Sequence, residues 1–367
     1  MDDKQSCNLT SINLMEHIFK DENTGKYLVD YLKLSQTAYL VTRVGSRQTL
    51  ADQWHPEWDK VQKRDRLLGV DITGVVDALD LLGWNEFETR LFYQALSKTI
   101  REAADIYHKH LGIPRSARVT LVKPNGTLSK LPGVSAGISR GYAPYQICRI
   151  RFSKSDPLAT ALYEAGMIPT PENSQGSDYY PDLSEEAYYT DLGSLYNNLM
   201  SYKEYTDVRN KRLSMSNEEL LFSEECTTWV FKFGVKGATP IRAIDESALV
   251  QLERYKLIQN NYTKDGHNTS NTITVADHEW EDVTKWLYDN WDYVIGLALL
   301  KRFDPNSPEC SHPQMPNEAC TKEEYDEIKK SIPTLNEAQL LTLLQQYEVN
   351  EELHDLEADC QGSCPVR

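Results

Sequence analysis

Apolar positions in the first third of the chain alternate between two spacings. Short β-branched or alternating runs predict strands, and apolar residues three or four positions apart predict helices packed on one side. The predicted order is strand, helix, strand, helix, helix, strand, over residues 7–14, 25–44, 66–74, 75–82, 85–111 and 119–122. The polar stretch 46–66 is interpreted as a loop. Strands that alternate with helices indicate parallel strands with helices packed outside, and therefore an α/β fold.

The same alternation returns after a polar middle. Residues 170–197 are acidic and rich in tyrosine, with weak periodicity, and predict an irregular insertion near 170–220. The run 148–152 carries alternating basic residues, which is typical of a solvated edge strand. Further strands are predicted over 227–235 and 268–275, and further helices over 156–166, 247–260, 279–299, 321–330 and 335–347.

The strand over 119–122 runs into a turn, Lys123-Pro124-Asn125-Gly126-Thr127, whose composition suits an anion. Pro124 lacks an N–H and has a fixed φ, and Gly126 tolerates a positive φ, so the chain must turn here. Thr127 and Ser129 add hydroxyls and backbone N–H donors, and Lys123 adds a positive charge. Such a turn can bind phosphate oxygens, although an ordinary strand–loop connection has the same residues. The following stretch, 132–145, is interpreted as a surface loop.

The cysteines do not form a disulfide framework. Their number is odd and their spacing irregular, and they stand at positions 7, 148, 226, 310, 320, 360 and 364. Cys7 suits a small buried hydrophobic position. Cys360 and Cys364 lie four positions apart in an acidic tail with little to bury, which favours a transient redox pair, the alternative being two chance cysteines. Cys310, His312 and Cys320 match no common zinc spacing, so no metal site is expected.

Charge excludes some classes of partner. The 367 residues include 39 Lys and Arg against 55 Asp and Glu, a net charge of −16. This balance argues against a nucleic-acid or anionic-membrane surface, although a local basic pocket stays possible. No apolar run approaches the roughly 20 residues of a membrane span, and the N-terminus has no signal-peptide core. A soluble, cytoplasmic protein of about two domains, or of one large α/β unit, is expected.

Several segments, in this order along the chain, resemble one enzyme family. They are 7–14, 67–74, 123–151 with Lys-Pro-x-Gly-Thr and Gly-Val-Ser-x-Gly, 228–236, 267–280, and 359–367 with Cys-x-Gly-x-Cys-Pro. The chain resembles the C-terminal part of adenosylcobalamin-dependent (class II) ribonucleotide reductases of the ribonucleoside-triphosphate type. The resemblance implies the second half of a ten-stranded α/β barrel over 1–345, followed by a flexible C-terminal redox tail over 346–367.

The resemblance also implies roles for individual residues. Cys7 corresponds to one of two active-site cysteines that reduce the ribose 2′ carbon and become a disulfide. Cys360 and Cys364 correspond to a dithiol that shuttles electrons from thioredoxin. The residues that correspond to the substrate-phosphate loop are Asn125, Gly126, Thr127, Leu128 and Ser129. Adenosylcobalamin is the implied cofactor, and no motif names the residues that would contact it.

One segment of the family is missing from this sequence. The radical cysteine of these enzymes lies in an Asn-Pro-Cys-Gly-Glu type segment shortly upstream of the strand that carries Cys7. The chain is therefore expected to need an N-terminal reductase fragment and to be inactive alone. The alternatives are a non-catalytic relic or regulatory fragment that binds a reductase or thioredoxin, a fragment of a diphosphate-type or iron-dependent reductase, and a phosphate-binding enzyme of another barrel family.

Overall fold

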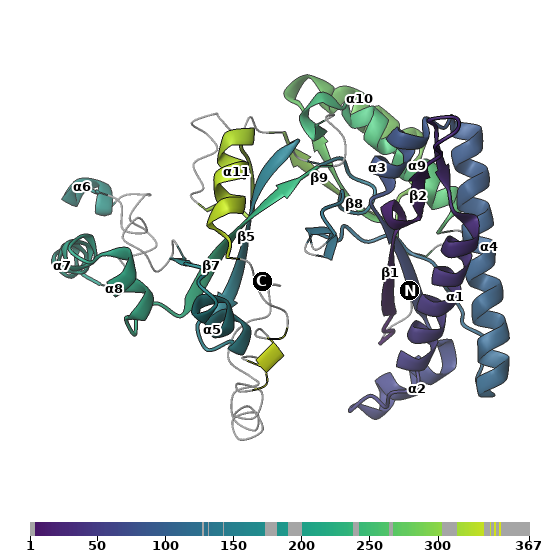
Figure 1. Ribbon diagram of the computed structural model, residues 1–367, viewed down its shortest axis with the longest axis horizontal. Helices are drawn as coiled ribbons and strands as arrows, with labels where there is room; N and C mark the ends of the chain where they lie inside the picture. The colour runs from purple at the N-terminus through teal and green to yellow at the C-terminus, as the bar shows by residue number, and fades with distance from the viewer. Residues whose placement is uncertain are drawn as a thin grey trace. The chain divides into compact units, whose positions relative to one another are not determined.

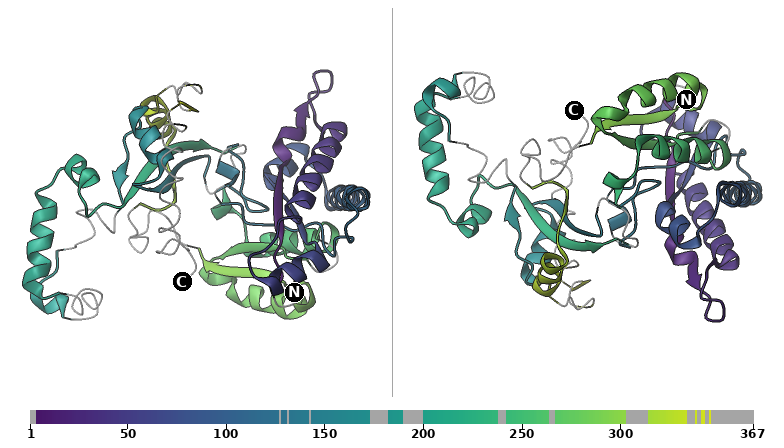
Figure 2. Two further views of the ribbon diagram at one scale, coloured as in Figure 1. Left: turned by 90° about the horizontal axis from the view of Figure 1, so that it is seen from below. Right: turned by 90° about the horizontal axis from the view of Figure 1, so that it is seen from above.

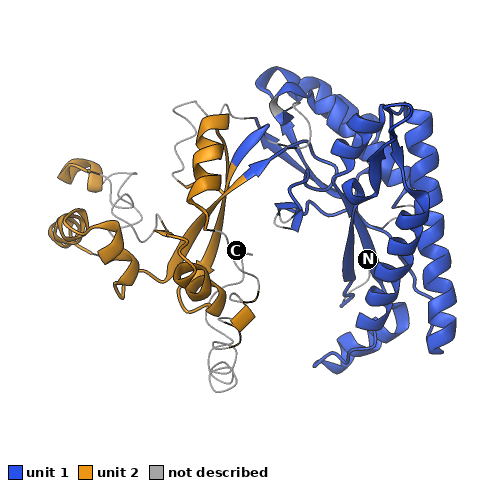
Figure 3. Ribbon diagram, in the orientation of Figure 1, with its two compact units in different colours: residues 1–146, 235–310 blue, residues 147–234, 311–367 orange. Residues whose placement is uncertain are grey.

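The computed structural model describes residues 4–126, 128–130, 132–141, 143–172, 182–189, 200–237, 242–263, 267–302, 314–333, 338, 341–342 and 345. The chain divides into two compact units (Figure 3). Unit 1 comprises 1–146 and 235–310, and unit 2 comprises 147–234 and 311–367. Among the described residues, no helix is both long and apolar enough to span a membrane.

Unit 1 is built on parallel strands. Strand β1 (Asn8–Asn13) pairs in parallel with β4 (Leu68–Thr73), and β8 (Ser270–Val275) pairs in parallel with β9 (Gly296–Lys301). The extended segment 119–122 lies between the two pairs through the parallel bridges Val70↔Thr120 and Val122↔Thr269. The strand order is therefore β1, β4, 119–122, β8, β9, which is also the order in the sequence. The predicted α/β class with parallel strands is confirmed.

Helices cover one face of these strands. They are α1 (Tyr31–Gln48), α3 (Val75–Leu82), α4 (Glu86–Leu111), α9 (Ala248–Asn261) and α10 (Trp280–Asp289). Helices α1 and α4 run side by side (Figures 1 and 2). A short hairpin of β2 (Ile18–Lys20) and β3 (Tyr27–Val29) precedes α1. Helix α4 begins at an Asn85–Glu88 capping box and ends at Gly112 in the left-handed conformation, as local sequence rules require.

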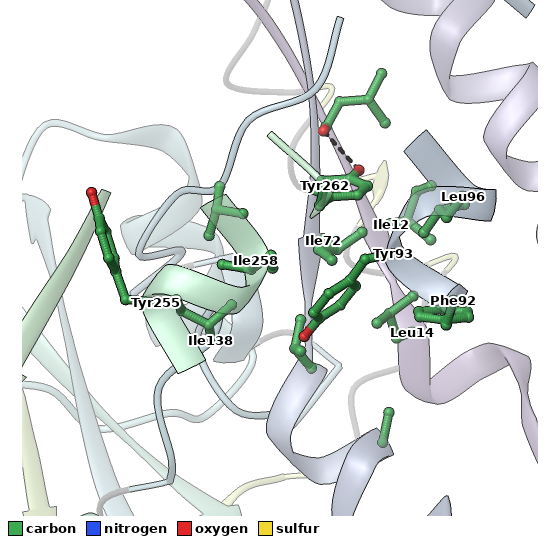
Figure 4. Close-up of a cluster of buried hydrophobic side chains, with 14 of the residues drawn as sticks. Ile12, Leu14, Ile72, Phe92, Tyr93, Leu96, Ile138, Tyr255, Ile258 and Tyr262 are labelled. Atoms are coloured by element: carbon green, nitrogen blue, oxygen red, sulfur yellow. Dashed lines mark hydrogen bonds between the residues drawn. The ribbon is translucent and has the colours of Figure 1, made fainter. Parts of the chain in front are cut away.

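The hydrophobic core of unit 1 lies between the helices and one face of the strands (Figure 4). Ile12 of β1 and Ile72 of β4 point into it, together with Phe92 and Tyr93 of α4 and Tyr255 of α9. Side chains along a strand alternate between its two faces. The odd-numbered residues of β1 and β4 therefore lie on the face away from the helices.

Unit 2 contains a four-stranded sheet of order β10, β5, β7, β6. Its strands are β5 (Tyr145–Ser153), β6 (Thr170–Pro171), β7 (Thr228–Lys236) and β10 (Asn317–Ala319). Its helices are α5 (Pro157–Glu164), α6 (Glu185–Tyr188), α7 (Tyr202–Leu213), α8 (Asn217–Phe222) and α11 (Lys322–Ser331). A separate apolar cluster around Leu162, Trp229 and Phe231 forms its core.

Three predicted elements have different bounds in the structure. The helix predicted over 25–44 is strand β3 followed by α1. The loop predicted over 46–66 contains helix α2 (Pro56–Asp65), which buries little besides Gln62 and so has no apolar stripe to reveal it. The helix predicted over 279–299 ends at Asp289, and a 3₁₀ turn (Trp291–Tyr293) precedes β9, which begins at Gly296.

One prediction of position in a sheet and one of exposure were wrong. The basic run 148–152 is part of β5, which lies inside the sheet of unit 2 and not at its edge. Its arginines reach the neighbouring segment: Arg149 Nη1 donates to Met315 O at 2.9 Å and Arg151 Nη2 donates to Gln314 O at 2.9 Å. The stretch 132–145 is not a simple surface loop, because Val134, Ser135, Ile138 and Ala143 are buried.

Candidate functional site

Cys7 lies beside His267, a residue that is 260 positions later in the sequence. The half-buried cysteine directly precedes β1, and its Sγ is 3.4 Å from Nε2 of His267, which is buried before β8. The same Nε2 is 3.1 Å from the backbone oxygen of Leu68. Because that oxygen can only accept a hydrogen bond, Nε2 carries the proton. His267 therefore donates from Nε2 toward the carbonyl oxygen and the sulfur.

Burial keeps both partners neutral. It raises the pKa of the Cys7 thiol to about 12, an effect that the positive charge of Lys123 partly opposes. It lowers the pKa of His267 to about 4, against the hydrogen bond to Leu68. At neutral pH the pair is thus a thiol beside a neutral imidazole, and not a thiolate–imidazolium ion pair. A protonated thiol can give a hydrogen atom or a proton to a substrate, but it is a poor nucleophile.

The predicted anion-binding turn directly follows the extended segment 119–122, which lies between β4 and β8. We call residues 123–129 the anion loop. Asn125 has a φ of +50°, Gly126 is exposed with nothing within 4 Å of the place a Cβ would take, and Ser129 N donates to Asn125 O at 3.1 Å. Leu128 and Ser129 begin a 3₁₀ turn. The Ser129 hydroxyl is buried and no described residue hydrogen-bonds to it.

Asp71 of β4 accepts hydrogen bonds from the anion loop. This carboxylate projects from β4 and is 2% exposed. Its Oδ1 accepts the backbone N–H of Lys123 at 2.8 Å, and its Oδ2 accepts the Ser11 hydroxyl at 2.8 Å and the Asn125 side-chain amide. Burial raises the pKa of Asp71 to about 6, and these three donors limit the rise.

A second loop packs against the first. Gly137 has a φ of +55°, and a Cβ added there would lie 2.4 Å from the backbone oxygen of Lys123. Its N–H donates to the Thr73 hydroxyl at 3.2 Å, which in turn donates to Ser135 O at 3.0 Å. The Gly-Val-Ser-x-Gly motif thus supplies a glycine where the two loops meet.

The sequence-predicted site residues are partly brought together. Cys7, Asn125, Gly126, Leu128 and Ser129 all belong to unit 1, and Lys123 acts electrostatically on both Cys7 and His267. Thr127, Cys360 and Cys364 lie outside the described residues, as do Cys310 and His312. Sequence reasoning missed Asp71 and Ser11, and it assigned His267 no role. An acidic residue inside the apolar run Leu67–Ile72 was the available signal for Asp71.

Comparison with known proteins gives one family name repeatedly. An adenosylcobalamin-dependent ribonucleoside-triphosphate reductase of Lactobacillus acidophilus is 32% identical over 165 residues, which cover 38% of this chain and 22% of the relative. The enzyme of the same name from Lactobacillus delbrueckii subsp. bulgaricus is 26% identical over 279 residues, covering 74% of this chain and 30% of the relative. A putative enzyme of this name from Mycobacterium phage D29 is 33% identical over 158 residues, covering 41% and 22%. No protein-family model matches the chain.

A solved structure supports the fold. The crystal structure of a B12-dependent (class II) ribonucleotide reductase matches 97% of this chain and 44% of its own chain, with a TM-score of 0.62 and 22% identity. The chain thus spans less than half of the proteins it matches, in sequence and in structure. The resemblance predicted from its motifs is confirmed: the chain is similar to a part of the adenosylcobalamin-dependent ribonucleoside-triphosphate reductases.

Proposed function

We propose that this chain is the C-terminal part of an adenosylcobalamin-dependent ribonucleotide reductase that converts ribonucleoside triphosphates to 2′-deoxyribonucleotides. The observation that carries the proposal is the placement of a protonated thiol and an anion loop in one unit, with Lys123 close enough to influence the thiol. The similarity to reductases of that name supports the choice of substrate class. In this proposal the parallel strands of unit 1 form half of the ten-stranded barrel.

Cys7 supplies reducing equivalents in this scheme. Two thiols that become one disulfide release two electrons and two protons. Replacement of the ribose 2′ C–OH bond by C–H consumes the same two electrons and two protons and releases water. Cys7 is one of the two thiols, and its partner belongs to a segment outside this chain. The raised pKa of Cys7 keeps the proton on sulfur until it is needed.

The anion loop holds the substrate phosphates. Gly126 leaves the backbone open to a ligand, Lys123 supplies a positive charge, and Ser129 has a hydroxyl that no described residue uses. Phosphate oxygens are well suited to a turn rich in N–H and O–H donors. Asn125 and Leu128 complete this loop, together with Thr127.

Adenosylcobalamin would supply the radical that starts the chemistry. A cavity of about 370 Å³ lies beside α4, the segment 119–122 and the end of α9, and its lining includes Gln94, Lys98, Arg101, Thr120 and Asn261. This volume suits a small ligand and is much too small for a corrin ring with its adenosyl group. This cavity therefore does not fit the cofactor, and we assign none of its lining residues to it.

Electron supply completes the proposal. Cys360 and Cys364 reduce the disulfide that contains Cys7 by thiol–disulfide exchange, and thioredoxin or a similar dithiol protein reduces them in turn. The thiyl-radical cysteine comes from an N-terminal reductase fragment. The chain alone is expected to be inactive.

A complementation assay tests the proposal. The full chain is mixed with an N-terminal reductase fragment that carries the radical cysteine, and CTP reduction is measured with adenosylcobalamin and thioredoxin. We expect activity from the mixture, none from Cys7→Ser, and about one turnover per site from the double variant Cys360→Ser, Cys364→Ser. Cys320→Ser is the matched control, because Cys320 is a free cysteine of unit 2 to which the proposal gives no role. An inert mixture whose parts still bind each other would favour a non-catalytic partner instead.

A further inference from the structure

Asp71 is an ionisable residue in a strand whose other residues are uncharged. It stands in the run Leu-Gly-Val-Asp-Ile-Thr, in which every residue is buried. A buried carboxylate is costly unless hydrogen bonds satisfy both of its oxygens. Because Asp71 is 2% exposed, its oxygens depend on protein donors rather than on solvent.

Two other segments supply those donors. Ser11 comes from β1, beside Asp71 of β4 in the parallel register. Lys123 and Asn125 come from the turn after the segment 119–122, on the other side of β4. The carboxylate therefore connects the strand that follows Cys7 to the anion loop.

The contacts fix backbone as well as side chains. Asn125 adopts a left-handed conformation, which costs free energy for a residue with a Cβ. Its side-chain amide is held by Asp71, and the N–H of Lys123, two residues earlier, is held by the same carboxylate. Two anchors on either side of Pro124 determine where the exposed Gly126 lies.

We infer that Asp71 is the positioning residue of the anion loop, setting its conformation through Lys123 and Asn125 without touching the substrate. The inference rests on the proposed function insofar as it names phosphate as the ligand of the loop. It does not depend on cobalamin, on the radical or on the N-terminal fragment.

Two substitutions separate position from charge. Asp71→Leu keeps the branched shape of the side chain but removes both acceptor oxygens. The Lys123 N–H then loses its partner, and the amide of Asn125 keeps only its 3.4 Å contact with the Ser11 hydroxyl. Asp71→Asn removes the same negative charge but keeps one acceptor, and the amide of Asn125 can flip to present its oxygen to the new donor. Any difference between the two variants therefore reports hydrogen bonding and not electrostatic repulsion of phosphate.

The matched control is Thr73→Val. Thr73 lies two residues further along β4, on the same face, and its hydroxyl serves the second loop through Ser135 and Gly137. Its loss removes buried hydrogen bonds from the same strand without removing a partner of Lys123 or Asn125.

Hydrogen exchange of the full chain gives the first measurement. We expect Asp71→Leu to accelerate amide exchange in peptides covering 121–126 by roughly tenfold or more, since a hydrogen bond to a carboxylate is lost. Asp71→Asn should have a smaller effect, and Thr73→Val none in these peptides. If Asp71→Leu does not fold, amide exchange in Asp71→Asn alone tests the inference, and we expect about threefold faster exchange in these peptides. Exchange unchanged in the folded Asp71 variants would overturn the inference.

The second measurement is the binding of inorganic tripolyphosphate to the full chain. We expect Asp71→Leu to bind roughly tenfold more weakly than Asp71→Asn at the same pH. If the wild-type chain does not bind tripolyphosphate but Asp71→Leu still accelerates exchange, the positioning role stands and the phosphate assignment of the proposed function fails. If the wild type binds and neither exchange nor binding differs between variants, the positioning role fails and the proposed function stands.

Discussion

The two parts of the site in unit 1 use burial in opposite ways. Where the strands begin, His267 is buried beside Cys7, and burial lowers its pKa to about 4. Further along β4, Asp71 is buried beneath the anion loop, and burial raises its pKa to about 6. The physical cause is the same, because desolvation disfavours whichever form carries the charge. A base becomes harder to protonate and an acid harder to ionise.

His267 and Asp71 differ in the groups that surround them. Asp71 receives three hydrogen bonds that support its charged form, so it can still ionise near pH 6. Nε2 of His267 donates to a carbonyl oxygen and faces an uncharged thiol, and Arg118 and Lys123 further disfavour a positive imidazole. The thiol end of the site is therefore neutral at pH 7, whereas the loop end carries a charge.

The largest expected effect is a pair of opposite pH dependences of stability. His267 has a folded pKa below its usual 6.5, so the stability it contributes is lost as the pH falls from 6.5 through 4. Asp71 has a folded pKa above its usual 3.8, so the stability it contributes is lost as the pH rises from 3.8 through 6. Each pKa shift corresponds to about 3 kcal/mol. In the wild type the two trends oppose each other between pH 4 and 6.

His267→Gln and Asp71→Asn separate these trends. Urea unfolding of the full chain is followed from pH 4 to 7, and each variant is subtracted from the wild type so that all other groups cancel. The wild type should lose stability relative to His267→Gln on acidification and gain stability relative to Asp71→Asn. Gln retains an N–H donor for the oxygen of Leu68. Two differences with the same sign of slope would contradict the assigned burial of one residue.

The next effect tests how closely the two loops meet. Gly137→Ala places a Cβ against the backbone oxygen of Lys123 at a positive φ. We expect a loss of about 2–5 kcal/mol in unfolding free energy, combining about 1–2 for the left-handed backbone with about 1–3 for overpacking. Gly83→Ala is the control, since Gly83 has a φ of +62° but open space around it, and should cost only about 1–2 kcal/mol. Equal losses in urea unfolding would mean that the loops can separate freely.

Local sequence signals were sufficient for much of unit 1. The alternation of β-branched runs with helical spacing predicted β1, β4, α3, α4, α9 and β8, because each has an apolar face that its own periodicity reveals. The turn at Pro124 and Gly126 was also predictable, since backbone conformation there depends on the residues themselves. Helix α2 lacked such a face, and its capping residues alone did not identify it.

The polar contacts of the site were not predictable in the same way. Cys7 and His267 are separated by 260 positions, and their approach depends on the order of five strands. Asp71 could be noticed as an acidic residue in an apolar strand, but its partners come from two other segments. Strand β5 was predicted to be an edge strand for a similar reason, since the sequence of one strand does not say which strands lie beside it.

The smallest expected effect concerns the residue that links the two parts of the site. Lys123 belongs to the anion loop, yet its positive charge opposes the rise in the pKa of Cys7. Lys123→Met removes this charge while keeping a long, unbranched side chain, so the thiolate fraction of Cys7 at a fixed pH should fall. Iodoacetamide alkylation of Cys7, read by peptide mass spectrometry at pH 8.5, should slow by roughly twofold to fivefold. Cys320 in unit 2 is the internal reference. Burial and neighbouring glutamates raise its pKa, and Lys123 is not among the groups that shift it. If Cys7 and Cys320 slowed together, the effect would be a general one and the thiol and the loop would be electrostatically independent.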